Sequence, residues 1–411
     1  MNHQDHIPCR LCDAPLRHIF CDLGLSPLAN RNLLPEEVVV ERLYPLIARV
    51  CEECFLVQVD NSVPPENIFS DYDYFSSYSE SWVAHAKRYS EDMCERFDLT
   101  PASFVVEVAS NDGYLLRHFV EAGIPVLGVE PAANVAAAAE KCGVPTLVAF
   151  FDTVTARIIS ERGRKADLIV ANNVLAHVPD TREFVAGFAE LLSETGVATF
   201  EFPHLLNLID EIQFDTIYHE HFFYLSLVSV EKMMASAGLR VFDVDEVPTH
   251  GGSLRVFVCH SNARFSEAEA VQKLREKERR HKLHSLEGYV GFKERVETVR
   301  DTFIAFIEHA LREGKTLAAY GAAAKGNTFL NFCSIKFPTV AAIYDRNPAK
   351  QGKLSPGTHI PILSPEHIRD LKPDYLIILP WNISDEIRST IKEINDWGGH
   401  FVTAVPSIRI Y

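Results

Sequence analysis

The chain of 411 residues has no long hydrophobic run and no excess of positive charge, and each absence excludes a class of protein. No stretch reaches the roughly 18 uncharged apolar residues that a membrane-spanning helix needs. Acidic side chains outnumber basic ones by 56 to 40, which gives a net charge of -16, whereas a nucleic-acid-binding protein needs a basic face. Because the first residues also lack the features of a signal peptide, we expect a soluble cytoplasmic protein without a membrane or nucleic-acid partner.

Cysteine is unevenly distributed along the chain, and its spacing indicates a metal site. Four of the nine cysteines form two C-x-x-C pairs, Cys9 with Cys12 and Cys51 with Cys54, separated by 38 residues. Two such pairs are typical of tetrahedral zinc, while the alternative, a pair of disulfides, is disfavoured in a reducing compartment. Four thiolates complete the coordination shell, so the sequence predicts a structural Zn²⁺ without an open position.

Strands alternate with helices in the middle of the chain. Apolar strand runs are predicted at residues 104–109, 126–130, 167–173 and 196–202. This alternation predicts an α/β fold with a doubly wound parallel sheet that binds its ligand at the carboxyl ends of the strands. The turn at residues 110–113 lacks the G-x-G-x-x-G fingerprint of a dinucleotide-binding site.

The end of the second strand carries Glu130, 17 residues after Gly113, where a carboxylate can accept both hydroxyls of an adenosine ribose. This pattern resembles the class I S-adenosylmethionine-dependent methyltransferases, although a doubly wound domain that binds another ligand stays an alternative. The resemblance implies that the first loop holds the methionine part of the cofactor. Ala109 replaces a glycine found in many members, which leaves less room for the ligand. The predicted cofactor residues are Glu107, Ala109, Asn111, Gly113, Glu130 and Asn172.

A segment rich in hydroxyl groups precedes this region. Residues 72–82 contain seven hydroxyl side chains, among them Tyr72, Tyr74 and Ser76, interleaved with aromatic rings. Such a segment is either a solvated linker that caps the next helix or a surface that binds a sugar or nucleotide.

The most unusual stretch runs from Tyr218 to His221 and contains a phenol, a carboxylate and two imidazoles within an apolar sequence. Burying these groups costs free energy unless each is paired, which favours a functional site over a hydrogen-bonded cluster in the core. The order His-Glu-His lacks the H-E-x-x-H spacing of a hydrolytic zinc site. His177 follows the fourth strand, so the sheet brings it toward the same crevice, although a core role is equally open.

A second strand, turn and helix begin at Lys315 and place Lys325 at the start of a helix, where its charge and free backbone amides can bind a phosphate. Asp345 ends the following strand, 19 residues after Gly326. The alternative of an NAD site is disfavoured because a bulky lysine occupies the turn. Upstream, Gly251 and Gly252 allow either a hairpin turn or a close approach to a ligand.

In this order, the cysteine pairs, the turn at 110–113, the Tyr-His-Glu-His run, the paired glycines and the Lys325 turn resemble the sugar C-methyltransferases. These enzymes act on nucleotide-linked 4-keto-6-deoxysugars, typically at C-3′. The resemblance extends over essentially the whole chain. It implies a zinc-binding domain at residues 1–70, a methyltransferase domain at 71–265, and a helical connection with a Rossmann-like substrate domain at 266–411.

The resemblance also implies a histidine base that matches His221. A carbon beside a ketone must lose a proton before it attacks a sulfonium methyl group, which requires a neutral imidazole and a donor for the enolate oxygen. We expect Glu220 to orient an imidazole. The expected surroundings of the sugar are Tyr72, His177, Tyr218 and Glu220, and the further substrate residues are Tyr74, Ser76, His250, Ser253, Arg255, Tyr320, Lys325 and Asp345.

Two alternatives stay open at this point. An O- or N-methyltransferase would need no cluster of bases, and a zinc-ribbon interaction protein with a degenerate methyltransferase fold would need no ligand residues. The expected partner is a dTDP- or GDP-linked sugar, and the expected oligomeric state is a monomer. Three cationic side chains, Arg255, Lys325 and Arg346, are expected to offset the acidic net charge of the protein where the diphosphate binds.

Overall fold

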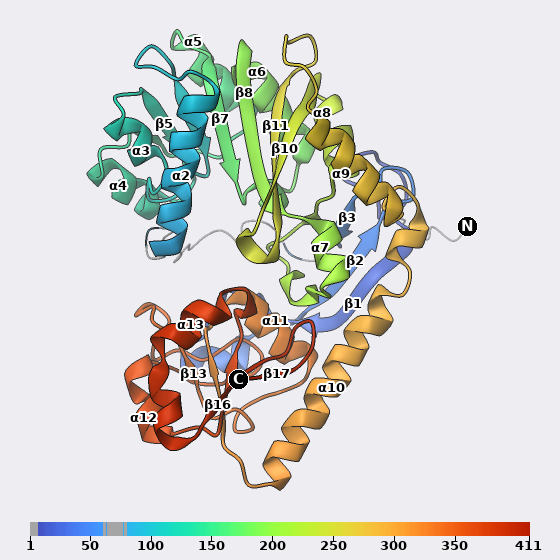
Figure 1. Cartoon of the computed structure of the whole chain (residues 1–411), viewed down its shortest axis with the longest axis vertical. Coiled ribbons are helices and arrows are strands. Elements are labelled where there is room, and N and C mark those ends of the chain that lie inside the picture. The colour runs from blue at the N-terminus through green and yellow to red at the C-terminus, as the bar shows by residue number, and fades with distance from the viewer. Residues whose placement is uncertain (1–6, 61–62, 64–76, 78–79) are drawn as a thin grey trace.

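The described residues form three β-sheets, and the long helix α10 runs beside the last sheet and reaches the first (Figure 1). The computed structural model describes residues 7–60, 63, 77 and 80–411. The predictions for Tyr72, Tyr74 and Ser76 therefore lie outside the described residues. Among the helices that are described, each is too short or too polar to cross a lipid bilayer.

The first sheet has four antiparallel strands in the order β1-β2-β3-β9. Strand β2 pairs with both β1 and β3. Strand β9 comes from far downstream and begins two residues after His221, which the sequence did not indicate. The strands are β1 (His18–Ser26), β2 (Tyr44–Val50), β3 (Val57–Val59) and β9 (Phe223–Tyr224), and the short 3-10 helix η1 (Pro35–Val40) connects β1 with β2.

The middle sheet has seven strands in the order β6-β5-β4-β7-β8-β11-β10. Numbered along the chain within this sheet, the order is 3-2-1-4-5-7-6. The first five are parallel, and β11 is antiparallel to both of its neighbours. The strands are β4 (Val105–Val108), β5 (Val126–Val129), β6 (Thr146–Leu147), β7 (Ala166–Asn172), β8 (Leu192–Pro203), β10 (Leu239–Val247) and β11 (Ser253–His260).

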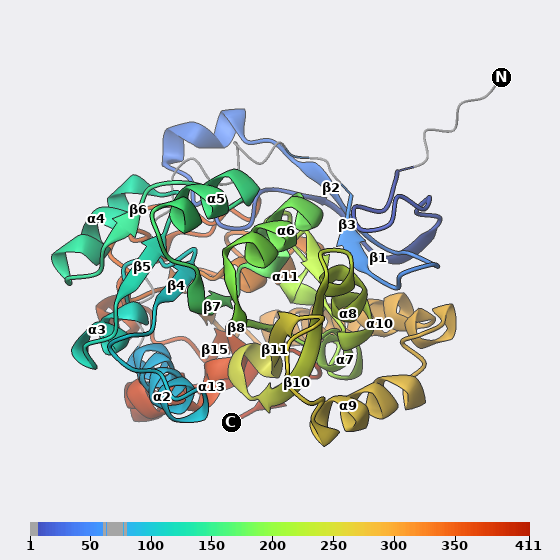
Figure 2. The same ribbon diagram turned by 90° about the horizontal axis from the view of Figure 1, so that it is seen from above.

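Helices cover both faces of this sheet, as the alternation of strands and helices predicts. Helices α5 and α6 pack on one face, and α2 and α3 pack on the other (Figure 2). Aspartates begin two of the helices: Asp152 accepts the amide of Thr155, and Asp180 accepts the amide of Glu183. The helices are α2 (Glu80–Arg96), α3 (Leu116–Glu121), α4 (Ala133–Lys141), α5 (Thr153–Glu161), α6 (Thr181–Leu191), α7 (Leu205–Asp210) and α8 (Leu227–Ala235).

The third sheet has six strands in the order β14-β13-β12-β15-β16-β17, all parallel except β17. Its internal order, 3-2-1-4-5-6, is that of a Rossmann fold. The elements are β12 (Leu317–Tyr320), α11 (Ala324–Phe332), β13 (Ile343–Tyr344), β14 (Ile362–Leu363), α12 (Ile368–Leu371), β15 (Tyr375–Ile378), α13 (Ser384–Thr390), β16 (His400–Thr403) and β17 (Arg409–Ile410).

Two helices, α9 (Glu269–Arg280) and α10 (Phe292–Arg312), join the middle and the last sheet. The apolar side chains spaced three and four residues apart along α10 are buried, so this helix faces a core. Phe292 stacks on Phe20 of β1 at 4.4 Å between ring centroids, and Phe303 meets Phe329 of α11 edge-on at 4.7 Å. The same helix therefore packs against the first sheet and the last domain.

The first and last parts of the chain also touch directly. The carboxylate of Glu41 accepts hydrogen bonds from the amide of Gly357 at 2.8 Å and from Nε2 of His359 at 2.7 Å. Leu33 pairs with Leu354 through their backbones. The segment between β1 and β2 is thus attached to the C-terminal domain.

Candidate active site

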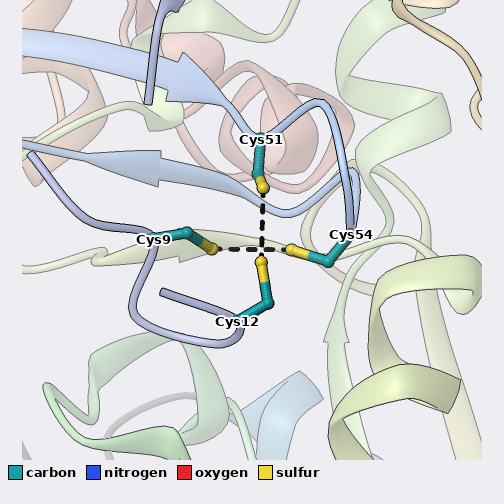
Figure 3. A group of neighbouring side chains, drawn as sticks. All are labelled: Cys9, Cys12, Cys51 and Cys54. Carbon is teal, nitrogen blue, oxygen red and sulfur yellow. Dashed lines mark hydrogen bonds between the residues drawn. The ribbon is translucent and has the colours of Figure 1, made fainter. Parts of the chain in front are cut away.

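The four predicted zinc ligands lie together between the two C-x-x-C turns (Figure 3). Their Sγ atoms all lie within 4.8 Å of one another, and the pairs Cys9–Cys54 and Cys12–Cys51 are 3.5 Å apart. Tetrahedral zinc with sulfur at about 2.3 Å separates its ligands by roughly 3.8 Å, so this donor set fits zinc. The residues fit a four-cysteine centre that leaves no position for a substrate.

The zinc module is connected to the Tyr218–His221 stretch through strand β3. The side chain of Gln58 donates to Sγ of Cys9 at 3.2 Å and accepts the amide of Arg10 at 3.1 Å. In the same strand, Gln58 pairs with Phe223 of β9. The guanidinium of Arg10 lies over the ring of Phe222 at 4.7 Å.

Replacing one zinc ligand tests the structural role of the metal. We expect Cys51→Ser to lose bound zinc and to lower the melting temperature by roughly 5 °C or more, because metal binding contributes directly to folding. Zinc content by mass spectrometry and thermal unfolding measure the two effects, and Cys142→Ser, at an exposed cysteine, is the control. A folded, zinc-free variant with an unchanged melting temperature would refute the structural role.

Polar residues from the ends of β4 and β5 form a tight loop. Glu130 accepts the amide of Asn111 at 3.0 Å and that of Ala132 at 2.9 Å. Ala109 and Asn111 have left-handed backbones with φ of 54° and 51°. Gly113 has φ of 77°, and a Cβ there would lie 3.0 Å from Val144, so the turn leaves no room for a side chain. The loop expected to hold the cofactor is therefore fixed by its backbone.

Several buried polar atoms around this loop have no partner within the described residues: Glu107 Oε2, Ser110 Oγ, Asp112 Oδ1, Asn172 Oδ1 and Asn173 Nδ2. Burial, with the nearby charges of Glu130 and Asp112, raises the pKa of Glu107 well above its usual value, and burial also raises the pKa of Glu130. Each Glu130 oxygen keeps a lone pair for a ribose hydroxyl. These unsatisfied groups fit a bound polar ligand of the S-adenosylmethionine type.

His221 lies in a turn between the 3-10 helix η4 (Phe214–Thr216) and β9. Its Nδ1–H donates to the carbonyl of Thr216 at 3.0 Å, and its Nε2 lies 2.8 Å from the hydroxyl of Tyr218. These two partners assign the tautomer with the proton on Nδ1. Burial, together with the charge that His177 would carry, lowers the pKa of His221 well below its usual value. The imidazole is thus neutral at neutral pH, as a base must be.

His177 lies beside His221, with 4.6 Å between the ring centroids. Its Nδ1 donates to the backbone carbonyl of Glu220 at 2.8 Å, and burial lowers its pKa to about 4. The structure therefore brings the His177, Tyr218 and His221 side chains together at the carboxyl ends of β7 and β8.

The other two members of the stretch point away from this group. His219 donates from Nε2 to the carbonyl of Pro45 in β2 at 3.2 Å, and the carboxylate of Glu220 accepts the amide of Asn30 at 3.1 Å. The expectation that the Glu220 carboxylate orients an imidazole is wrong, because the turn from Tyr218 to His221 sends the intervening side chains toward the first sheet. A backbone carbonyl, that of Thr216, orients His221 instead.

A buried carboxylate that the sequence analysis missed lies at the end of β8. Glu201 is fully buried and contacts Nε2 of His85 at 3.0 Å, Nη2 of Arg255 at 2.8 Å and the hydroxyl of Thr249 at 2.9 Å. Burial alone would raise the pKa of Glu201, but the hydrogen bond from His85 and the charge of Arg255 outweigh it and lower the pKa to about 2. The sequence does contain a signal for this site, because Glu201 is an acidic residue within the apolar strand run at residues 199–203.

This ion pair corrects the expectation for Arg255. Its guanidinium lies against Glu201 and over the ring of Tyr89 at 4.7 Å, so the charge expected at a diphosphate is already neutralised inside the sheet. Ser253 is also buried and donates its hydroxyl to the carbonyl of Thr249 at 2.9 Å. Both side chains hold the β10–β11 hairpin in place.

His250 is at the tip of that hairpin and has a left-handed backbone with φ of 54°. Its ring meets Trp82 edge-on at 5.2 Å, and burial together with the charge of Lys325 lowers its pKa to about 4. The adjacent Gly251 has φ of 90°, and a Cβ there would lie 2.6 Å from the ring of Trp381, so the glycine permits close contact with the C-terminal domain.

Lys325 lies half-buried where the middle and C-terminal domains meet. Its ammonium donates to the Asn382 side chain at 2.7 Å and lies 4.7 Å from the centre of the Trp381 ring. Burial lowers the pKa of Lys325, and burial raises that of the nearby Asp215 to about 6. Burial lowers the pKa of His221, and the charge of Lys325 acts in the same direction.

Asp345 and Tyr320, the remaining predicted substrate residues, lie at the ends of β13 and β12. Asp345 accepts the amides of Ala322 and Asn347, both at 2.8 Å, and so closes the turn that precedes Lys325. The Tyr320 ring packs into the apolar cluster that contains Ile387 of α13. The structure therefore places Asp345 next to the turn and Tyr320 on the face of the sheet that α13 covers.

The lowered histidine pKa values make the stability of the fold depend on pH. A histidine with a folded pKa near 4 and an unfolded pKa of about 6.5 binds fewer protons when folded, so its contribution is present above pH 6.5 and is lost as the pH falls toward 4. Asparagine tolerates the left-handed backbone of this position, so we use His250→Asn. When the pH falls from 6.5 to 4, we expect the free energy of unfolding of this variant to decrease by about 1–3 kcal/mol less than that of the wild type. Denaturant unfolding at several pH values measures this difference. Identical pH dependence would contradict it.

Three family models match successive parts of the chain. Residues 9–69 match a zinc binding domain, residues 84–244 a methyltransferase domain, and residues 248–406 a C-methyltransferase C-terminal domain. The C-methyltransferase NovU of Streptomyces niveus is 36% identical over 404 residues, which are 98% of this chain and 96% of NovU.

Other relatives match a smaller share of the chain. The ubiquinone biosynthesis O-methyltransferase of Rhodopseudomonas palustris is 29% identical over 112 residues, 25% of this chain and 44% of that protein. A solved S-adenosylmethionine-dependent methyltransferase from Clostridium acetobutylicum covers 48% of this chain and 96% of its own, with 15% identity and a TM-score of 0.36.

The strand order of the middle sheet, its polar loop and the methyltransferase match define a class I S-adenosylmethionine-dependent methyltransferase with an N-terminal zinc-binding domain. More narrowly, the chain belongs to the C-methyltransferase family that includes NovU. It is thus an enzyme that methylates carbon in a small-molecule substrate. Membership in this family sets aside the alternatives of an O- or N-methyltransferase and of a degenerate interaction protein.

Proposed function

We propose that this enzyme methylates C-3′ of a nucleotide-linked 4-keto-6-deoxysugar, in the biosynthesis of a branched-chain deoxysugar, and that His221 removes the proton. The observation that carries this proposal is the environment of His221. It is a buried, neutral imidazole whose Nδ1 is fixed by a backbone carbonyl and whose Nε2 is left as the proton acceptor beside a phenol. A carbon acid beside a ketone requires such a base.

The proton is taken up by Nε2 of His221, while Nδ1–H keeps its hydrogen bond to Thr216 and stabilises the positive charge. The Tyr218 hydroxyl is the donor closest to this nitrogen, so it is the group that turns to the ketone oxygen as the enolate forms. His177, which is neutral and 4.6 Å away, lines the same side of the sugar. Bound S-adenosylmethionine supplies an electrophilic methyl group on its sulfonium.

The cofactor residues follow from the polar atoms of the first loop. Glu107, Ala109, Asn111 and Gly113 would hold the methionine part, and Glu130 would accept the ribose hydroxyls. Asn172 is the last residue of β7, at the same edge of the sheet, and its Oδ1 has no partner among the described residues. Hydrogen bonds to the ligand would satisfy these groups, which supports the assignment.

The nucleotide, a dTDP or GDP group, would lie at the C-terminal domain, residues 266–411, with the diphosphate next to Lys325. The half-buried ammonium and the start of α11 support an anion site here. His250, Tyr320 and Asp345, with Tyr72, Tyr74 and Ser76 before α2, complete the proposed substrate site. Ser253 and Arg255 support it from the hairpin. The cysteine centre at residues 1–70 serves the fold, residues 71–265 carry the chemistry, and the chain acts as a monomer.

Replacing the base tests the proposal. We expect His221→Ala to lower kcat by a factor on the order of 10²–10⁴ while S-adenosylmethionine still binds, because a general base contributes about that much. The assay uses dTDP-, GDP- and CDP-linked 4-keto-6-deoxysugars in D₂O and follows both methyl transfer and deuterium uptake at C-3′ by mass spectrometry. His219→Ala is the matched control, since His219 faces Pro45.

The wild type should incorporate deuterium at C-3′, and His221→Ala should abolish this exchange. Near-normal exchange and turnover in His221→Ala, with loss of both in His177→Ala, would assign the base to His177. No exchange or methylation of any sugar by the wild type would refute the substrate class.

The role of Lys325 is tested separately. We expect Lys325→Ala to raise the KM for the nucleotide sugar at least about tenfold and to change kcat much less, because loss of one charged contact to a phosphate weakens binding. Steady-state kinetics separate the two constants, and Lys336→Ala, at an exposed lysine beyond the same helix, is the control. A fall in kcat with unchanged KM would contradict the phosphate assignment.

A further inference from the structure

Asp215 is a buried acid that the proposed reaction does not use directly. It lies in the short helix η4. The residue after it in the same helix is Thr216, whose carbonyl accepts the Nδ1–H of His221 at 3.0 Å. Its side chain is 1% exposed, and Oδ1 has no hydrogen-bond partner among the described residues. Burying a carboxylate that has few hydrogen-bond partners costs free energy. The hydrogen bond that Asp215 does accept therefore stabilises its buried position.

That contact comes from the C-terminal domain. The indole Nε1–H of Trp381 donates to Oδ2 of Asp215 at 2.7 Å, across 166 residues of sequence. Trp381 follows β15 in the 3-10 helix η8 (Trp381–Ile383), at the carboxyl edge of the last sheet. A hydrogen bond to an ionised acceptor is stronger than one between neutral groups, so this contact favours one position of η4.

Trp381 is itself held from two other sides. The ammonium of Lys325 lies 4.7 Å from the ring centre, and the same ammonium donates to Asn382, the next residue in η8. On the opposite domain, a Cβ at Gly251 would lie 2.6 Å from the ring, so glycine is required for the ring to approach. These contacts restrict the position of the indole ring between the proposed phosphate site and η4.

We infer that Trp381 and Asp215 are positioning residues through which the C-terminal domain fixes the base loop, residues 214–222. The chain of contacts runs from Lys325 and Asn382 to Trp381, from Trp381 to Asp215, and from the adjacent Thr216 to His221. This inference rests on the proposed role of His221 as the base. It assigns the C-terminal domain a part in orienting the base, in addition to holding a nucleotide.

The test replaces Trp381 with phenylalanine, which keeps one aromatic ring for Lys325 and removes the indole N–H together with the second ring. Trp397→Phe is the matched control, because Trp397 also donates its indole N–H, to the carbonyl of Pro373 at 3.0 Å, in the same domain. The tautomer of His221 is read from ¹⁵N NMR of histidine-labelled full-length enzyme, with His221→Gln to assign its signals. This readout needs no substrate.

In Trp381→Phe we expect His221 to lose its single Nδ1–H tautomer and kcat to fall about tenfold to a hundredfold, since a charged hydrogen bond is lost. The KM for the nucleotide sugar should change by less than about threefold, and S-adenosylmethionine affinity and melting temperature should match those of Trp397→Phe. These outcomes separate positioning of the base from general stabilisation.

A tautomer and kcat equal to those of Trp397→Phe would overturn the inference. Equal losses in both tryptophan variants would overturn it too, because they would reflect the stability of the domain. Failure of the base assignment is a different result: His221→Ala would then keep its turnover, while the tautomer measurement would still report whether Trp381 orients His221.

Discussion

The backbone of Phe222 is the constraint on which the site depends. Its amide donates to the carbonyl of Ala176 at 2.7 Å, and its carbonyl accepts the amide of Val59 at 3.0 Å. Buried backbone groups must be paired, so Phe222 cannot move without breaking contacts to two parts of the protein. Because Phe222 follows His221 and Ala176 precedes His177, the bond to Ala176 sets the distance between the two imidazoles. The bond from Val59 of β3 connects them with the zinc module.

Burial gives the site its protonation state. Burial lowers the pKa values of His177, His221 and His250, and the charge of Lys325 acts in the same direction on the latter two. The imidazoles are therefore neutral over the whole physiological range, which suits proton removal. The acid at the end of β8 behaves oppositely, since Glu201 stays ionised between His85 and Arg255. The middle domain thus holds neutral imidazoles and a buried ion pair.

Sequence patterns within short segments predicted the strands, the helices and the zinc site. Contacts between residues far apart in the sequence could not be predicted. The zinc site is predicted from the spacing of cysteines within two short segments, and the structure confirms that the four cysteines lie together. The direction of the Glu220 side chain depends on β9 joining a sheet more than a hundred residues upstream, which two apolar residues could not indicate. Likewise, nothing near Asp215 or Glu201 in sequence identifies Trp381 or His85 as a partner. The roles of the predicted site residues stay predictions.

We expect the neighbours of the base loop, residues 214–222, to hold it rigidly before any substrate binds. Amide hydrogen exchange of the intact enzyme tests it most directly, because exchange reports local opening. We expect the amides of His221 and Phe222 to be protected as strongly as those of β7. Removing zinc with a chelator should abolish the protection of these two amides before that of β7. Exchange of both amides within seconds in the zinc-loaded enzyme, as in a free loop, would contradict it.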